Sequence, residues 1–370
     1  MSKQENSTNT GGVWAAIEPT LDTSNPADTP QHDSHHESHA GHSGQHGSIA
    51  LARSLIEKKY HPVMIFGTQA SGKSSLLASL FHYLQNDPRS EAICMLGEWI
   101  LPVDSTYGQT VADQIESFFN RAVMNFNTGA AAPRTHHHTI PYFIPVVLRP
   151  SNGKPEIRVA FLESSGENYE LNKEGAGYFK GLKDEILDVY RHFPGALSIL
   201  LVAPYTLKDA YTDQEIESAD DPAFQAIDQA LYGALQSYQR ERRWLDLDNY
   251  LFVLTKWDVY TGGISNPEFA KAPVGLVDKV ISERYPLAWN FYRTMPKKGR
   301  SNSMQYSSGL ITGSSVISVP DKLKPVIHQF PRALWNWLYM NASGGKALNG
   351  PSSDDRKPTG FGSWLKKVLS

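Results

Sequence analysis

The residues best suited to chemistry in this chain form a glycine-rich stretch, residues 67–74, which reads G-T-Q-A-S-G-K-S. It follows the apolar run 63–66 and precedes residues 75–81, whose apolar positions recur at helical spacing. A strand, a glycine turn and a helix start form the context in which this motif binds phosphate, because loop N–H groups and a helix N-terminus attract anions. We expect Lys73 to reach the β- and γ-phosphates and the Ser74 hydroxyl to bind Mg²⁺. The sequence therefore predicts a nucleoside triphosphate site built from Gly67, Gln69, Ala70, Ser71, Gly72, Lys73, Ser74 and Ser75.

A second motif bears on which base is bound. Residues 255–258, T-K-W-D, directly follow the apolar run 250–254. The Asp258 carboxylate can accept hydrogen bonds from N1–H and the 2-amino group of guanine, and adenine lacks that pair of donors. The stem of Lys256 would lie along the base. Thr255, Lys256 and Asp258 therefore favour a guanine nucleotide.

A third motif, Glu163-Ser164-Ser165-Gly166, follows the strand-like run 157–162. A carboxylate at this place can hold a Mg²⁺-bound water, and the Gly166 N–H can meet the γ-phosphate. All three motifs come at the ends of predicted strands, where an open α/β sheet places its ligand.

In this order, the motifs resemble those of the translation-factor-related (TRAFAC) class of P-loop GTPases, most closely the divergent bacterial double-GTPase domains. The resemblance covers roughly residues 58–340 and is most specific at residues 67–74 and 255–258. Glu163 stands where the class usually has aspartate, and Glu167 stands where many members have glutamine. The longer Glu163 changes the expected metal geometry, and a carboxylate at Glu167 can only accept hydrogen bonds.

The resemblance also implies site residues outside these motifs. It places a Mg²⁺- and γ-phosphate-sensing threonine before the second strand, at Thr135 or Thr139, and the distance to the strand favours Thr135. Arg134 beside it is either an arginine finger in cis or, more often in such loops, an ordinary surface residue. A base-contacting loop is placed at residues 306–309, Y-S-S-G, which contain Ser307 and Ser308, and residues 313–315 are a rival position.

The chain must supply a sheet that positions these residues. Runs 142–148 and 157–162, joined by a short Pro- and Gly-containing link, predict an antiparallel hairpin. Later strands near 197–203, 250–255 and 303–308 alternate with helices near 178–192, 222–243, 274–291 and 321–340. This pattern predicts a three-layer α/β sandwich of the P-loop NTPase type, with a mainly parallel sheet. A helical stripe over 109–127 is interpreted first as core packing and second as a partner surface.

Composition limits the remaining possibilities. The 370 residues are 40% hydrophobic with a formal net charge of -3, so a large core can form. Residues 1–48 hold six acids and one base, which leaves the remainder too balanced to predict a nucleic-acid polymer as partner. A single cysteine, a polar N-terminus and no apolar run long enough to span a membrane predict a cytoplasmic protein.

The two ends differ from the predicted domain over 49–340. Residues 1–48 are polar and His-rich, which predicts disorder and favours weak, adventitious metal binding over a physiological metal role. Residues 341–370 are read as a linker followed by an amphipathic segment, residues 361–369. That segment could contact a membrane surface or a partner, or could pack against its own domain.

These features predict a GTP-binding switch with slow hydrolysis to GDP, in which Lys73, Thr135, Glu163 and Glu167 act on the γ-phosphate. Ser74, Thr135 and Glu163 would hold Mg²⁺, and a protein partner would read residues 128–140 and 164–180. Two alternatives are a nucleotide-binding scaffold subunit that hydrolyses poorly and an ATP-dependent P-loop enzyme. Dimerisation across the nucleotide is compatible with the sequence.

Overall fold

A computed structural model describes residues 51–100, 106–127, 142–163, 184–208, 215–216, 218, 221–263, 266–296, 303–308 and 328–345. In these ranges a seven-stranded sheet has the order β2-β3-β4-β1-β5-β8-β9. The strands of this sheet are β1 (His61–Phe66), β2 (Ala92–Leu96), β3 (Tyr142–Pro150), β4 (Ile157–Glu163), β5 (Ser198–Pro204), β8 (Asn249–Thr255) and β9 (Ser303–Gln305). The helices are α2 (Lys73–Asn86), α3 (Thr106–Asn127), α4 (Asp184–His192), α5 (Pro222–Glu241), α6 (Trp257–Tyr260), α7 (Pro267–Ala270), α8 (Leu276–Arg284), α9 (Pro286–Thr294) and α10 (Gln329–Ala342).

The predicted fold class is confirmed by this topology. β1 pairs in parallel with β4 and β5, and β8 pairs in parallel with β5 and β9. The predicted hairpin is present, because β3 runs antiparallel to β4 with Tyr142 opposite Glu163 and Leu148 opposite Ile157. Gly153, at φ +75°, lies in its turn and has the left-handed conformation that glycine tolerates.

The sequence analysis missed the edge strand β2, which pairs antiparallel with β3 and places Cys94 opposite Leu148. β3 therefore has an antiparallel neighbour on each side, where a single hairpin was expected. β2 is only five residues long, and its outward-facing side chains, Ile93 and Met95, are exposed although they are apolar. A half-exposed strand without polar alternation gives no period-two signal.

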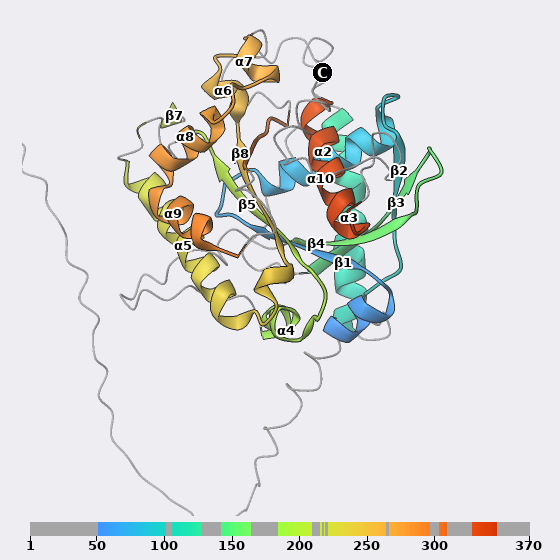
Figure 1. Ribbon diagram of the computed structural model, residues 1–370. Helices are drawn as coiled ribbons and strands as arrows, with labels where there is room; N and C mark the ends of the chain where they lie inside the picture. Colours follow the sequence, from blue (N-terminus) through green and yellow to red (C-terminus); the bar gives the residue numbers. More distant parts are fainter. Residues whose placement is uncertain are drawn as a thin grey trace, which may run out of the picture. The chain divides into compact units, whose positions relative to one another are not determined.

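Helices cover both faces of the sheet (Figure 1). On one face α2 packs against α3, where the rings of Phe81 and Phe119 lie 4.8 Å apart. α10 covers the same face through Trp335, whose ring meets Phe161 of β4 edge to face. On the other face Phe66 of β1 contacts Tyr190 of α4 and Tyr238 of α5. The helical stripe over 109–127 is therefore core packing in its first half, as the first interpretation held.

The single helix predicted near 274–291 is two helices in the structure. The pattern over 274–291 is divided at Tyr285, where α8 ends and Pro286 opens α9. Proline lacks the N–H that would continue α8, but it suits the first position of a new helix. Asp228 of α5 fixes this junction, since its carboxylate accepts hydrogen bonds from the N–H groups of Leu287 (2.9 Å) and Ala288 (2.8 Å). Two short strands, β6 (Leu207–Lys208) and β7 (Glu215–Ile216), were also not predicted.

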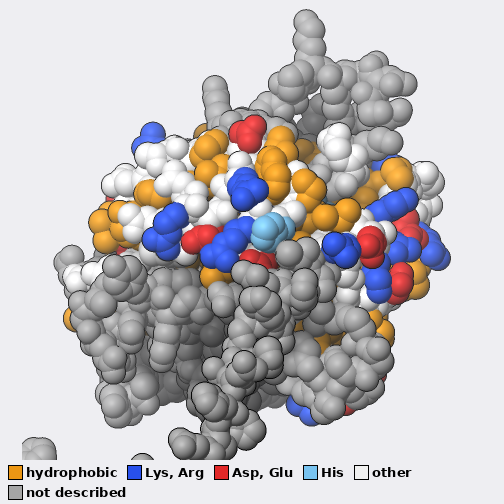
Figure 2. Space-filling view, turned by 90° about the horizontal axis from the view of Figure 1, so that it is seen from below, with side chains coloured by type: hydrophobic (Ala, Val, Ile, Leu, Met, Phe, Trp, Pro, Cys, Tyr) orange, Lys and Arg blue, Asp and Glu red, His pale blue; other side chains and the backbone are white. Residues whose placement is uncertain are grey.

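The His-rich segment 1–48 and the amphipathic segment 361–369 lie outside the described residues, so both expectations stay predictions. None of the helices in the described ranges combines the length and the apolar character that a membrane span requires. Figure 2 shows the face that lies below in Figure 1, where basic, acidic and hydrophobic side chains are interspersed. On the described part of that face, charge is mixed and does not form a continuous basic stripe.

Candidate nucleotide-binding site

The glycine-rich loop lies between β1, at the centre of the sheet, and α2. Its backbone needs special conformations at Ala70, with φ +59°, and Gly72, with φ +92°. Gly67 admits no side chain, because a Cβ there would lie 2.6 Å from Ser71 Oγ and 2.7 Å from the carbonyl oxygen of Val202. Gly72 is the N-cap of α2 and offers no side-chain acceptor to the first-turn N–H groups. The loop therefore forms a close-fitting turn that presents a helix N-terminus, which suits a phosphate group.

Lys73 crosses back over this turn. Its ammonium group donates hydrogen bonds to the carbonyl oxygens of Gly67 (2.6 Å) and Thr68 (3.0 Å), and the residue is buried. The geometry therefore places a positive charge inside the loop, where a phosphate oxygen would be attracted.

The sheet brings Ser74 and Glu163 together. The Ser74 hydroxyl, in the first turn of α2, donates a 3.1 Å hydrogen bond to Glu163 Oε1 at the end of β4. Glu163 is almost fully buried, at 1% exposure. A hydroxyl and a carboxylate beside a phosphate loop are the hard oxygen donors that Mg²⁺ prefers, so these two residues fit a magnesium ion. Thr135, Gly166 and Glu167 lie outside the described residues, and their roles stay predictions.

Thr255 connects the base motif to the phosphate loop. Its hydroxyl at the end of β8 donates to the carbonyl oxygen of Ser71 at 2.7 Å. Lys256 then has a left-handed backbone, with φ +57°, and its ammonium group donates to the carbonyl oxygen of Thr206 at 2.7 Å. This sharp turn starts α6 and brings Asp258 round to the same side of the sheet as the loop.

Asp258 is buried and accepts a 2.6 Å hydrogen bond from the Ser307 hydroxyl, which follows β9. Burial raises the pKa of the Asp258 carboxyl above its ordinary value, and the hydrogen bond from Ser307 partly offsets that effect. The geometry brings Ser307 to Asp258, whereas the rival position at 313–315 lies outside the described residues. A cavity beside this carboxylate is lined by Gly72, Ser75, Leu76, Thr255, Lys256, Asp258, Tyr306 and Ser308.

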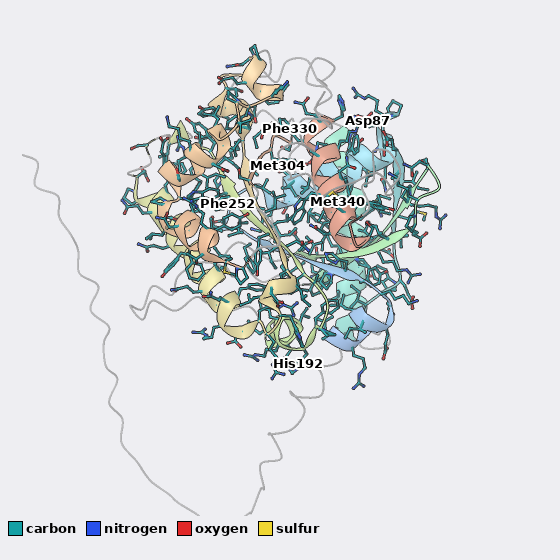
Figure 3. The ribbon with its side chains drawn as sticks, in the orientation of Figure 1. Asp87, His192, Phe252, Met304, Phe330 and Met340 are labelled. Carbon is teal, nitrogen blue, oxygen red and sulfur yellow. The ribbon has the colours of Figure 1, made fainter. Side chains whose placement is uncertain are left out.

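Of the residues that line this cavity, Leu76 was not assigned to the site from the sequence, and Tyr306 was placed in the base-contacting loop without a role for its side chain. The Tyr306 hydroxyl hydrogen-bonds to Ser79 Oγ of α2, and the Trp257 N–H donates to the Tyr306 carbonyl at 3.2 Å. The Tyr306 ring also packs against Phe330. Figure 3 labels Phe330 near the start of α10. The sequence placed Tyr306 in that loop, but its contacts with α2 and α10 depend on the fold.

No family profile matches the sequence, and no curated protein matches it. Among solved structures, the chain is similar to the signal recognition particle receptor SRb-GTP/SRX complex from Chaetomium thermophilum at 13% identity, covering 67% of this chain and 91% of that one, with a TM-score of 0.34. It is also similar to the Ski7 GTPase-like domain of S. cerevisiae bound to GTP at 11% identity, covering 86% and 51%, with a TM-score of 0.30.

A third similar structure is a mutation variant of SsGBP, at 14% identity and a TM-score of 0.28, covering 73% of this chain and 60% of that one. The chain's own strand order and loop geometry define an α/β fold with a glycine-rich loop between its central strand and the helix that follows.

Proposed function

We propose that this chain binds GTP and GDP with Mg²⁺ and hydrolyses GTP slowly, as a switch whose nucleotide state a protein partner reads. The observation that carries the proposal is the hydrogen bond from Thr255 to the Ser71 carbonyl. It joins the predicted base motif to the predicted phosphate loop, so that one ligand with a base and a phosphate chain can engage both.

Guanine is favoured by the chemistry at Asp258. The carboxylate is buried beside a cavity, and a buried acceptor gains most from a ligand that offers two adjacent donors. Guanine offers N1–H and the 2-amino group, whereas adenine presents an unprotonated N1 there. An ATP-dependent enzyme is therefore the weaker candidate.

The proposal of slow hydrolysis depends on the residues at the phosphate end of the site. Lys73 and the loop N–H groups would stabilise charge on the transferred γ-phosphoryl group, and Ser74 and Glu163 would hold the metal. Mg²⁺, when bound, neutralises phosphate charge. Glu163 takes the place where aspartate is usual in the class that the motifs resemble, and it contacts Ser74 directly. The longer glutamate side chain changes the expected metal geometry, which favours weak catalysis and keeps a hydrolysis-poor scaffold as the second candidate.

Binding of fluorescent GTP, GDP and ATP to the full chain, with and without Mg²⁺, tests the proposal when combined with single-turnover phosphate release. We expect guanine-selective binding and slow release.

Lys73→Ala should weaken binding by about tenfold to a hundredfold, because it removes a charged hydrogen-bond donor. Asp258→Asn should lose guanine preference and gain affinity for xanthine nucleotides, whose C2 carbonyl accepts from the new amide; the exposed Asp246→Asn is the control. Equal affinity for ATP and GTP would refute the base assignment, and binding without release would favour the scaffold.

A further inference from the structure

Arg284, the last residue of α8, is buried at 9% exposure. Its guanidinium carbon lies 3.9 Å from the ring centroid of Tyr205 and 4.9 Å from that of Phe224. Its Nη1 is buried and has no hydrogen-bond partner among the described residues. Within those residues, the positive charge is therefore stabilised by two aromatic faces and by the C-terminal end of its own helix.

Tyr205, the residue under this guanidinium, holds the turn that carries Asp258. The Tyr205 N–H donates a 2.9 Å hydrogen bond to the Thr255 carbonyl. The carbonyl oxygen of the next residue, Thr206, accepts from the Lys256 ammonium group at 2.7 Å. Two consecutive residues after β5 thus hold the last residue of β8 and the residue that follows it.

Aromatic contacts extend this support to the far side of the turn. The Tyr205 ring meets Tyr260 edge to face at 5.1 Å, and Tyr260 stacks on Trp257 at 4.4 Å. Trp257 lies between Lys256 and Asp258 and is fully buried. The series Arg284–Tyr205–Tyr260–Trp257 therefore packs along the outside of the turn.

The turn needs such support because Lys256 has a left-handed backbone, at φ +57°, which is unfavourable for a residue with a Cβ. Neighbouring contacts must keep the strained conformation populated. The hydroxyl of Tyr285, next to Arg284, adds to them by donating to the Pro204 carbonyl at the end of β5. Two residues at the α8–α9 junction, Arg284 and Tyr285, therefore contact consecutive residues at the end of β5 and just after it.

We propose that Arg284 is a positioning residue for base recognition, which fixes the Tyr205 ring and thereby the turn that presents Asp258. This inference rests on the proposed guanine site. A methionine would fill a similar volume, but it could not provide the flat cation that orients an aromatic ring. The arginine therefore orients the Tyr205 ring. An apolar residue of similar size should keep the fold but lose part of the preference for guanine.

Arg284→Met and Arg284→Lys in the full chain test the proposal with GDP and inosine diphosphate as probes. Inosine lacks the 2-amino group, so the ratio of the two affinities reports whether Asp258 meets both donors of guanine. We expect Arg284→Met to weaken GDP binding about threefold to thirtyfold, the range of one lost cation–π contact. The GDP-over-IDP ratio should fall as well, and Arg284→Lys should recover part of both.

The matched control is Arg158→Met, which removes a guanidinium 6.0 Å from the Tyr60 ring at the opposite end of the strands. That variant should keep the wild-type ratio even if its melting temperature falls. Tyr260→Leu is a second test, independent of the folding of the Arg284 variants, and should also lower the ratio.

An Arg284→Met protein that melts earlier but keeps the wild-type GDP-over-IDP ratio would overturn the inference and leave Arg284 as packing. That result would leave the proposed function intact. A wild-type chain without preference for GDP over ADP would instead refute the guanine site, and the inference with it.

Discussion

The hydroxyl of Thr255 lies 2.7 Å from the carbonyl oxygen of Ser71, although the two residues are 184 positions apart in the chain. The same hydroxyl lies 3.3 Å from the Ala203 carbonyl at the end of β5. A Cβ at Gly72, the neighbour of Ser71, would lie 3.3 Å from this hydroxyl, so the loop and the end of β8 are in close contact. The end of β8 therefore packs directly against the glycine-rich loop.

Thr255→Val should weaken GDP binding by about fivefold to tenfold, because valine keeps the shape and removes one hydrogen bond, worth about 1 kcal/mol. The substitution leaves the Ser71 carbonyl without the hydrogen bond that the Thr255 hydroxyl donates. Titration with fluorescent GDP measures the effect. Thr294→Val, whose hydroxyl bonds to the Phe291 carbonyl on an exposed part of α9, is the control. Unchanged affinity in Thr255→Val would mean that the contact does not shape the loop.

The contact between Ser74 and Glu163 predicts how affinity depends on magnesium. Glu163→Gln removes the negative charge but keeps the length of the side chain. We expect the gain in GDP affinity on adding Mg²⁺ to shrink by about tenfold or more, because a carboxylate near the metal is lost. Binding without Mg²⁺ should change little.

The control for that variant is Glu156→Gln, which removes a surface partner of Arg149 at the other end of β4. Glu163→Asp tests the chain length directly, since it restores the residue that is usual in the class the motifs resemble. If Glu163→Gln binds Mg²⁺–GDP as the wild type does, the metal assignment is wrong.

The sequence predicted those parts of the site in which local pattern and fold agree. Residues 67–74 and 255–258 each follow a buried strand, and parallel strands bring their carboxyl ends to one edge of a sheet. The hairpin of β3 and β4 followed from a short link with turn residues. Such features need only local information and one topological rule.

Features that depend on contacts between distant residues were not predictable. β2 has the apolar sequence A-I-C-M-L, which fits a strand or a buried helix equally well until its pairing with β3 is known. Pro286 is a local signal for the split of α8 from α9, but the anchoring of that junction by Asp228, a residue of another helix, required the structure. The place of Tyr306 in the cavity likewise depends on α2, more than two hundred residues away in the chain.

A buried ion pair at the amino end of the sheet predicts a large effect on stability without an effect on binding. Asp248, fully buried, accepts from both Arg242 Nε (2.9 Å) and Nη2 (2.8 Å), and from the Leu197 N–H (2.8 Å). Asp248→Asn should lower the free energy of unfolding by about 3–5 kcal/mol, because the Arg242 charge is left buried without its counterion.

Urea denaturation of the full chain measures that loss, and GDP titration of the folded variant should give the wild-type affinity. Asp246→Asn, an exposed residue of the same turn, is the matched control. A loss below 1 kcal/mol would mean that water reaches Arg242 in solution. A loss of affinity in the folded variant would mean that the two ends of the sheet are coupled.

The pH dependence of nucleotide binding follows from Asp258. Burial raises the pKa of its carboxyl above the ordinary value for aspartate, and guanine recognition needs the ionised form. GDP affinity should therefore fall as pH is lowered, beginning above the range in which an exposed aspartate titrates. Ser307→Ala removes a hydrogen bond that favours the carboxylate, so its loss of affinity should begin at higher pH still.

The stability of the nucleotide-free chain should respond with the opposite sign at this residue. A raised pKa means that the folded chain binds a proton more readily than the unfolded chain, so the Asp258 contribution to stability increases as pH falls through its folded-state pKa. Comparing wild type with Asp258→Asn, which cannot titrate there, isolates this contribution in denaturation curves over pH. If GDP affinity and the Asp258 contribution to stability both fell on acidification, the carboxylate would be stabilised by the fold, and the desolvated guanine acceptor proposed for Asp258 would be wrong.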